Sequence, residues 1–238
     1  MAAPLHLQPT APLARRVLLP GDPGRALLLA QSLINAPKMF NHHRGLWGYS
    51  GTATDGEPLT IQSTGMGGPS AAIVISELAD LGATTMLRVG TCGALQGGFE
   101  LGELIVATEA IGDDGTSRAL GVSGRVHASP ALLGALASAT DARRGPVVST
   151  DLFYDDPRDP QPGWIADGAL AVEMESSTLF ALAARRGFEA GSLLLVTDLL
   201  AGERVRIEAE ELRAAEHRLG DAALLGLTTL ARAAGSAQ

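Results

Sequence analysis

Cysteine is nearly absent from this sequence: Cys92 is the one cysteine among 238 residues. A single thiol cannot form a disulfide within the chain, and it cannot build a zinc site rich in cysteine. A chain of this length buries roughly 70% of the surface that its unfolded form exposes, so it needs no covalent cross-link to fold. The lone thiol fits the reducing conditions of a cytoplasm.

Long apolar runs and excess positive charge are also missing. No stretch approaches the roughly 18–20 apolar residues that a membrane-spanning helix needs. Polar residues and prolines interrupt the N-terminal sequence, so it lacks the continuous apolar region of a secretory signal peptide. The net charge of −8 argues against a general nucleic-acid or anionic-membrane surface. We therefore expect a cytoplasmic protein with neither partner, in which any phosphate binds in a local basic pocket.

Short apolar runs alternate with stretches of helical periodicity along the chain. The expected strands cover 17–19, 58–63, 85–89, 104–108, 169–173 and 192–197, and the expected helices cover 25–33, 70–81, 176–186 and about 207–234. Strands that end in glycine-rich turns and lead into helices predict a largely parallel sheet covered by helices. In such sheets ligands bind at the carboxyl ends of the strands.

No composition shift, repeat or low-complexity block divides the chain, so we expect a single α/β domain over residues 1–238. The segment 155–163 is rich in proline and aspartate, which predicts a surface loop that could serve as a mobile flap. Residues 233–238 are expected to fray.

Two of the expected strand ends carry an arginine. In Gly21-Asp22-Pro23-Gly24-Arg25, amides at a helix start and a guanidinium fork suit an anion. Arg88 interrupts an apolar strand just before Thr91, which is costly unless the charge is paired or used on a ligand. Together the two predict a phosphate pocket. Two alternatives stay open: a strand–helix turn with a solvent-facing arginine, and an arginine paired with a structural carboxylate.

The glycine-rich segment Gly65-Met66-Gly67-Gly68-Pro69-Ser70 only partly imitates a dinucleotide-binding fingerprint. Ser70 takes the sixth position, and Pro69 fits that motif poorly. The chain also lacks the Gly-Lys-Ser/Thr sequence of an ATP-hydrolysing loop. The segment therefore indicates close backbone approach to a ligand or a neighbouring element.

Carboxylates mark two further strand ends. Glu173 and Glu175 flank Met174 at a strand–helix junction, where they could accept hydrogen bonds from sugar hydroxyls beside a soft apolar thioether. Acids at a helix start can also simply match the helix dipole. Asp198 ends the most apolar strand, and an apolar pocket would raise its pKa as a general acid requires. A structural turn-capping role is the alternative.

A metal site and a thiol nucleophile find less support. His42 and His43 are adjacent, but no further ligands stand at suitable spacing. No histidine or aspartate is placed to activate Cys92. We expect no metal and no cofactor.

The turns, in their order, resemble the family of trimeric and hexameric purine and uridine phosphorylases within the nucleoside phosphorylase-I superfamily. The motifs that carry the resemblance are Gly21-Asp22-Pro23-x-Arg25, His43-Arg44-Gly45, Gly65-Met66-Gly67, Arg88-Val89-Gly90-Thr91-x-Gly93, Asp151-Leu152-Phe153-Tyr154, Val172-Glu173-Met174-Glu175 and Thr197-Asp198. The resemblance implies a three-layer α/β/α fold with a mixed, barrel-like central sheet. It also implies a pentosyltransferase that acts on nucleosides with inorganic phosphate as co-substrate.

The resemblance assigns a role to each candidate residue. Phosphate would bind Gly21, Arg25, Arg88, Thr91 and, from a neighbouring subunit, Arg44. The ribose would contact Met174, Glu175 and the neighbour's His6, the latter at the 5′-hydroxyl. The base would contact Phe153, Val172 and Glu173, and Asp198 would protonate its N7. The implied assembly is a homohexamer, a trimer of dimers, in which His6 and Arg44 cross a dimer interface.

Some details depart from the family pattern or stay open. The arginine that helps the acid could be Arg204, Arg206 or Arg213. The uracil-reading Gln/Arg segment of uridine phosphorylases is not evident, which together with Asp198 favours reversible phosphorolysis of purine ribo- and deoxyribonucleosides. The alternatives are a uridine phosphorylase, a nucleosidase that uses water, and a non-catalytic nucleoside-binding protein. The sequence does not rank adenosine, inosine and guanosine.

Overall fold

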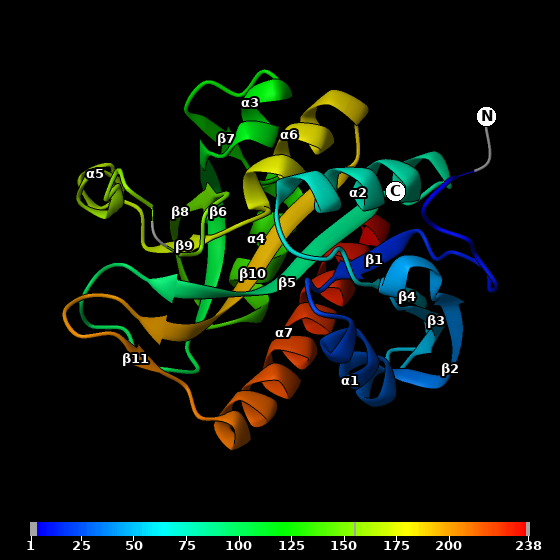
Figure 1. Cartoon of the computed structure of the whole chain (residues 1–238). Coiled ribbons are helices and arrows are strands. Elements are labelled where there is room, and N and C mark those ends of the chain that lie inside the picture. The colour runs from blue at the N-terminus through cyan, green and yellow to red at the C-terminus, as the bar shows by residue number, and fades with distance from the viewer. Residues whose placement is uncertain (1–3, 155, 237–238) are drawn as a thin grey trace.

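The computed structural model describes residues 4–154 and 156–236, and within them the chain forms eleven strands, seven α-helices and one 3-10 helix (Figure 1). The strands are β1 Arg16–Leu19, β2 Ile34–Asn41, β3 Gly48–Ala53, β4 Pro58–Gln62, β5 Thr85–Ala94, β6 Leu104–Asp113, β7 Arg125–His127, β8 Arg143–Thr150, β9 Ala171–Glu173, β10 Glu189–Leu199 and β11 Val205–Arg206. The helices are α1 Pro23–Leu33, α2 Gly68–Asp80, α3 Gly115–Ala119, α4 Pro130–Ala139, α5 Gln161–Ala166, α6 Ser176–Arg186 and α7 Ala209–Ser236, with η1 at His43–Gly45.

The central sheet closes on itself. Strands β5, β10, β6, β8 and β9 pair in a ring, because β9 returns to pair with β5. From the ring, β5 continues through parallel β1 and β4 to antiparallel β3 and β2. The expected mixed, barrel-like sheet is therefore confirmed. In Figure 1, β5 and β10 run side by side and end toward α5 and β11, on the side away from the N-terminal segment.

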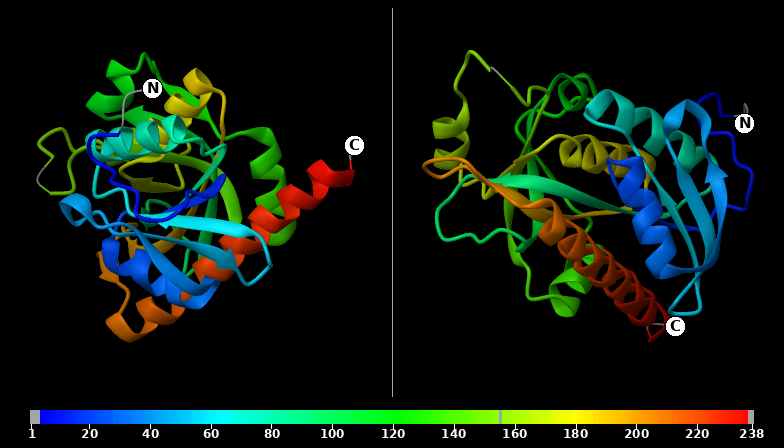
Figure 2. Two further views of the ribbon diagram at one scale, coloured as in Figure 1. Left: turned by 90° about the vertical axis from the view of Figure 1, so that its right-hand side faces the viewer. Right: turned by 60° about the horizontal axis from the view of Figure 1, so that its bottom comes forward.

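Helices cover both faces of the sheet because its central strands are apolar on both sides. On β5, Met86 packs into a core with α2 and α6, whereas its neighbour Leu87 packs into a core with α1, α4 and α7. Successive strand residues point to opposite faces, so one strand serves both layers. The right-hand view in Figure 2 shows α1 and α7 together on one side of the sheet. The expected three-layer α/β/α arrangement follows from this alternation.

Strand β5 is longer than the sequence predicted. The expectation that it ends at Val89 and turns through Gly90–Gly93 is wrong, because these residues pair with β10 and β9 as far as Ala94. Gly90 and Gly93 instead leave space for neighbouring side chains. A Cβ on Gly90 would lie 2.6 Å from Cζ of Arg88, so only glycine leaves room for the guanidinium.

Other boundaries also differ from the expectations. Strands β2, β3, β7, β8 and β11 and helices α3 and α4 were not among the expected elements. Helix α5 begins inside the expected loop 155–163, of which Asp155 lies outside the described residues. Helix α7 continues to Ser236 through most of the stretch that was expected to fray, and 237–238 are likewise not described. Among the described helices, none is long and apolar enough to cross a membrane.

Candidate active site

A cavity of about 750 Å³ lies at the carboxyl ends of β1, β4, β8 and β10 and along the second half of β5. It gathers most of the residues that the sequence singled out, although they come from separate parts of the chain. The predicted site residues in its lining are Gly21, Arg25, Arg88, Thr91, Phe153, Val172, Glu173, Met174, Glu175 and Asp198. His6 and Arg44 do not line it.

Arg25 enters the cavity from the start of α1. Asp22 caps this helix by accepting a hydrogen bond from the Gly24 amide at 2.8 Å, and Pro23 follows at a position where no amide is needed. The Arg25 side chain is buried, and its Nε donates to Oε1 of Glu216 at 2.7 Å. The alternative of a solvent-facing arginine is therefore wrong. Glu216 lies on α7, 191 residues further along the chain.

Arg88 lies between two carboxylates. Its Nε donates to Oε2 of Glu173 at 2.8 Å, and its Nη2 lies 2.6 Å from Oε2 of Glu175. Burial lowers the pKa of the guanidinium, but the charges of Glu175 and Glu173 outweigh burial and hold that pKa above its usual range. Arg88 thus stays charged. The alternative of a paired arginine is confirmed, in a position that also lines the cavity.

Glu173 is the most enclosed member of this cluster, with no side-chain exposure. Besides Arg88, its carboxylate accepts hydrogen bonds from the amides of Glu175 and Ser176 and from the Ser149 hydroxyl. The sequence predicted that Glu173 contacts the base. Glu173 lines the cavity as expected, and its carboxylate oxygens are directed to the arginine and the helix start, so its contact with a base stays a prediction.

Glu175 has other partners than Glu173, and burial affects its pKa more than any neighbouring charge does. Its Oε1 accepts the Gly67 amide at 2.5 Å, while Oε2 meets Arg88. Burial is the largest influence and raises the pKa of Glu175; Arg88 opposes this, and the charge of Glu173 adds to it. Glu173 and Glu175 share one guanidinium in this buried cluster. A group that donates hydrogen bonds, such as a sugar hydroxyl beside Met174, would suit it.

Asp198 closes the opposite end of the cavity. Its Oδ1 accepts two hydrogen bonds from Arg204, at 2.9 Å from Nε and 2.7 Å from Nη2, and its Oδ2 accepts the Thr197 hydroxyl at 3.0 Å. The expected apolar surrounding is wrong, because a guanidinium and a hydroxyl contact the carboxylate. Of the three candidate arginines, Arg204 makes the contact. Arg206 pairs with Asp198 only through the backbone of β11.

Phe153 forms the rim beside Asp198. Phe153 is 54% exposed, and its ring packs edge-on against Tyr154, with ring centroids 4.7 Å apart. The Arg204 guanidinium lies over the same ring at 5.3 Å from the centroid. One arginine thereby links the exposed aromatic ring to the buried carboxylate.

Residues beyond Phe153 complete the rim: some belong to the expected loop 155–163, whereas Trp164 was not predicted. Trp164 of α5 lines the cavity and donates through Nε1 to Asp113 at 3.0 Å. Arg158 reaches the same Asp113 at 2.9 Å and also pairs with Asp156. A lone tryptophan within an otherwise polar, proline-rich segment was the available signal. These contacts hold the segment against the end of β6.

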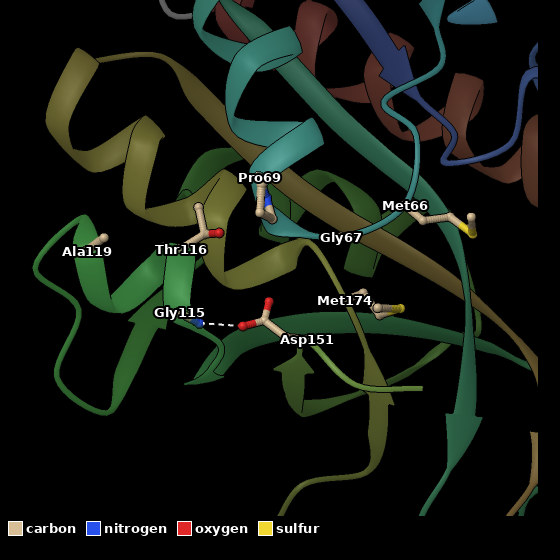
Figure 3. Close-up of a pocket in the computed structure, with 8 residues that line it drawn as sticks. All are labelled: Met66, Gly67, Pro69, Gly115, Thr116, Ala119, Asp151 and Met174. Carbon is tan, nitrogen blue, oxygen red and sulfur yellow. Dashed lines mark hydrogen bonds between the residues drawn. The ribbon is translucent and has the colours of Figure 1, made fainter. Parts of the chain in front are cut away.

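A second, more open hollow of about 580 Å³ adjoins the cavity (Figure 3). The two share Met66 and Met174, whose side chains extend away from α3 in Figure 3. On the α3 side, the Gly115 amide donates to Asp151 at 2.7 Å. Met66 is 85% exposed, so this side of the cavity opens directly to the surface.

His6 and Arg44 lie together on another part of the surface. Glu77 of α2 accepts hydrogen bonds from the amides of residues 5–7 and from Nδ1 of His6 at 2.7 Å. The carbonyl of His6 in turn meets Nδ1 of His43, next to the exposed Arg44. Arg44 has a φ of 59°, a left-handed conformation that is uncommon outside glycine. The structure thus brings these two residues together but outside their own chain's cavity.

Known proteins are similar to this chain in sequence and in architecture. The family model of the phosphorylase superfamily matches residues 15–229. A DeoD-type purine nucleoside phosphorylase from Geobacillus kaustophilus (strain HTA426) is 37% identical over 213 residues, which cover 85% of this chain and 89% of that protein. A guanosine phosphorylase from Halorubrum lacusprofundi is 39% identical over 202 residues, covering 82% and 83%. The crystal structure of a uridine phosphorylase from Vibrio fischeri ES114, complexed with 6-hydroxy-1-naphthoic acid, is similar with a TM-score of 0.78, 32% identity and 92% coverage of both chains.

Proposed function

The chain belongs to the phosphorylase superfamily, and on this premise we propose that it is a purine nucleoside phosphorylase. It cleaves purine ribo- and deoxyribonucleosides with inorganic phosphate to the free base and the pentose 1-phosphate, and the reaction is reversible. The observation that carries the proposal is the cavity, which joins two buried arginines at one end to an aspartate–arginine pair at the other. The purine nucleoside phosphorylases among the similar proteins support the same reaction.

Phosphate binds at the arginine end. The Gly21 amide, Arg25, Arg88 and Thr91 form its site, at the start of α1 and along β5. Amides at a helix start and guanidinium groups donate strong hydrogen bonds to anions. The phosphate oxygen attacks C1′ of the pentose as the bond from C1′ to the base nitrogen breaks. Holding this nucleophile in place lowers the barrier by positioning and by compensating the positive charge that develops on the sugar.

The nucleoside spans the rest of the cavity. Glu175 accepts the ribose hydroxyls, with Met174 packed against the sugar. The base stacks on Phe153 and lies against Val172. Glu173 lines the cavity beside Val172, with its carboxylate bonded to Arg88.

Asp198 is the general acid. When the bond to the base breaks, its electrons pass to the purine, and Asp198, which carries a proton in the complex with the nucleoside, donates that proton to N7. Arg204 then stabilises the carboxylate that remains, through the two hydrogen bonds to Oδ1. General-acid assistance is typically worth roughly 10²–10⁴-fold in rate.

Assembly is part of the proposal. We infer a cytoplasmic homohexamer, a trimer of dimers, in which His6 and Arg44 reach the ribose and phosphate of a neighbouring subunit. In support, both residues lie on one surface with exposed Leu5 and Trp47 and outside their own cavity.

The course of α2 also supports a two-fold contact. The helix begins at Gly68, beside the cavity, and reaches Glu77, which holds His6, roughly 14 Å further along its axis. Ile73, midway between them, is 40% exposed. A two-fold axis near Ile73 would place each subunit's His6 near the other subunit's cavity, as an isologous interface requires.

The proposal is tested by measuring base release from inosine, adenosine, guanosine and uridine, each with and without inorganic phosphate. Phosphate-dependent release from the purine nucleosides, with ribose 1-phosphate formed, is the expected result. Release without phosphate would identify a nucleosidase. Release from uridine alone would identify a uridine phosphorylase, and no release would favour a binding protein.

A further inference from the structure

Both cavity arginines are held in the same way. Nε of Arg88 donates to Glu173 at 2.8 Å, and Nε of Arg25 donates to Glu216 at 2.7 Å. Each carboxylate comes from a distant segment, since Glu216 follows Arg25 by 191 residues. In both cases the contact occupies the nitrogen nearest the side-chain stem. Nη2 of Arg88 also meets Oε2 of Glu175 at 2.6 Å, which leaves Nη1 of Arg88 and, among the described residues, the terminal nitrogens of Arg25 for other partners.

We propose that Glu216 and Glu173 are positioning residues for phosphate binding, each acting through its arginine and touching no substrate. This inference rests on the proposed phosphorolysis. An arginine side chain is long and flexible, and anchoring Nε restricts the plane of its guanidinium before the ligand arrives. The anchored arginine then presents its outer edge to the phosphate without a further loss of side-chain freedom.

Glu216 is held firmly enough for this role. Its neighbours Ala215 and Leu219 are fully buried in the core between α1 and α7. The two helices approach closely at Gly220, where a Cβ would lie 2.5 Å from Cδ2 of Leu29 on α1. Because Arg25 extends from the start of α1, this packing sets the distance between Arg25 and Glu216. The long C-terminal helix thereby becomes part of the phosphate site.

Glu173 anchors Arg88 from the other side, and its own position is fixed by the Ser149 hydroxyl and the amides at the start of α6. The Arg88 guanidinium packs over Gly90, where a Cβ would lie 2.6 Å from its Cζ and displace it. Removing the carboxylate would free the guanidinium to turn toward Glu175 alone. Arg25 also lies close enough to Glu175 to influence it electrostatically, so the two anchored arginines serve one site.

The first test is Glu216→Gln, with exposed Glu211→Gln on the same helix as the matched control. Losing one charge-assisted hydrogen bond should raise KM for phosphate about tenfold. KM for the nucleoside and kcat at saturating phosphate should stay within about twofold, as should all constants of the control. A general structural defect would instead lower kcat and change both KM values together.

A double-mutant cycle then asks whether Glu216 acts through Arg25. Arg25→Ala should raise KM for phosphate, and adding Glu216→Gln should change it no further, because the anchored group is gone. Independent, additive effects would overturn the inference. So would an unchanged or lower KM for phosphate in Glu216→Gln, the latter showing that the carboxylate merely competes with the anion.

The Glu173 arm is Glu173→Gln, judged by the same separation of the two KM values. If that buried variant does not fold, the role of Glu173 is given up. The Glu216 double-mutant cycle then tests by itself whether Glu216 positions Arg25. Failure of the positioning role can be told apart from failure of the proposed phosphorolysis. If wild-type base release needs no phosphate, phosphorolysis fails; if Arg25→Ala impairs phosphate use and Glu216→Gln does not, phosphorolysis stands and the anchor fails.

Discussion

The two walls of the cavity are built differently. On the strand wall, Arg88, Glu173 and Glu175 have side chains no more than 7% exposed, and each is bound by several partners. On the rim, Leu152, Phe153 and Tyr154 are 49%, 54% and 70% exposed. Charged groups that act on a transition state are most effective when they are fixed in advance, away from water. A planar base needs only an apolar face, which an adaptable rim can supply.

Asp198 connects the two walls, since it ends β10 but contacts Arg204 of the rim. The largest expected effect is therefore at this residue: Asp198→Asn should lower kcat on purine nucleosides roughly 10²–10⁴-fold, because the amide cannot donate a carboxylic proton. The measurement is kcat on ordinary purine nucleosides and on a nucleoside whose base leaves without protonation. An equal loss on both substrates would remove the general-acid role.

Arg88→Ala tests the strand wall. It leaves two buried carboxylates without their cation, so the free energy of unfolding should fall by about 3–5 kcal/mol, and KM for phosphate should rise. Urea unfolding and phosphate kinetics measure the two effects. Arg206→Ala, on exposed β11, is the control and should change stability by no more than about 0.5 kcal/mol. Equal stability losses would break the contrast between the walls.

Arg204→Gln tests the link between rim and acid. We expect kcat to fall about tenfold, because one charge-assisted contact to Asp198 is lost, with little change in melting temperature. The same substitution at Arg213 provides the comparison, since Arg213 makes no contact with Asp198 among the described residues. A larger loss at Arg213 would show that another arginine assists the acid.

Phe153→Ala tests the rim by itself. Losing the aromatic face should raise KM for the nucleoside about 2- to 12-fold, while KM for phosphate and the melting temperature stay near wild type. Tyr154→Ala, which removes only the edge contact to the ring, should have a smaller effect. A clear drop in melting temperature for Phe153→Ala would mean that the rim is structural, like the strand wall.

The smallest effect is expected at Cys92, on the strand wall. Burial, followed by the charge of Glu173, raises the pKa of this thiol well above its usual range. The thiol therefore stays protonated, and unreactive, from neutral pH to about pH 9. Iodoacetamide should leave activity unchanged over that range. Rapid, pH-dependent inactivation would show that this wall opens to solvent.

Much of the fold was predictable because it follows local rules. Helix α6 begins and ends at the expected residues, and the turn Gly21–Arg25 starts α1 as its capping aspartate and proline indicate. Strands with less regular patterns were missed, β8 among them, because pairing partners stabilise them more than their own side chains do.

The candidate site was predictable to the same extent. Local motifs and the resemblance that they carry identified ten lining residues, most of which stand near strand ends, whereas Arg88 and Thr91 lie within β5. They could not indicate that Glu173 bonds to Arg88 or that Trp164 completes the rim. Nor could they indicate which of the three candidate arginines contacts Asp198. Each of these depends on which distant segments meet.

The sequence by itself determined the order of turns, the alternating apolar strands and the residue types at the strand ends. The tertiary structure alone decided the partners of the charged groups. Arg25 finds Glu216 only because α1 and α7 pack closely at Gly220, and Arg88 finds Glu173 only because β9 closes the ring onto β5. A hydrogen bond requires contact within about 3 Å, and such proximity between remote residues is set by packing.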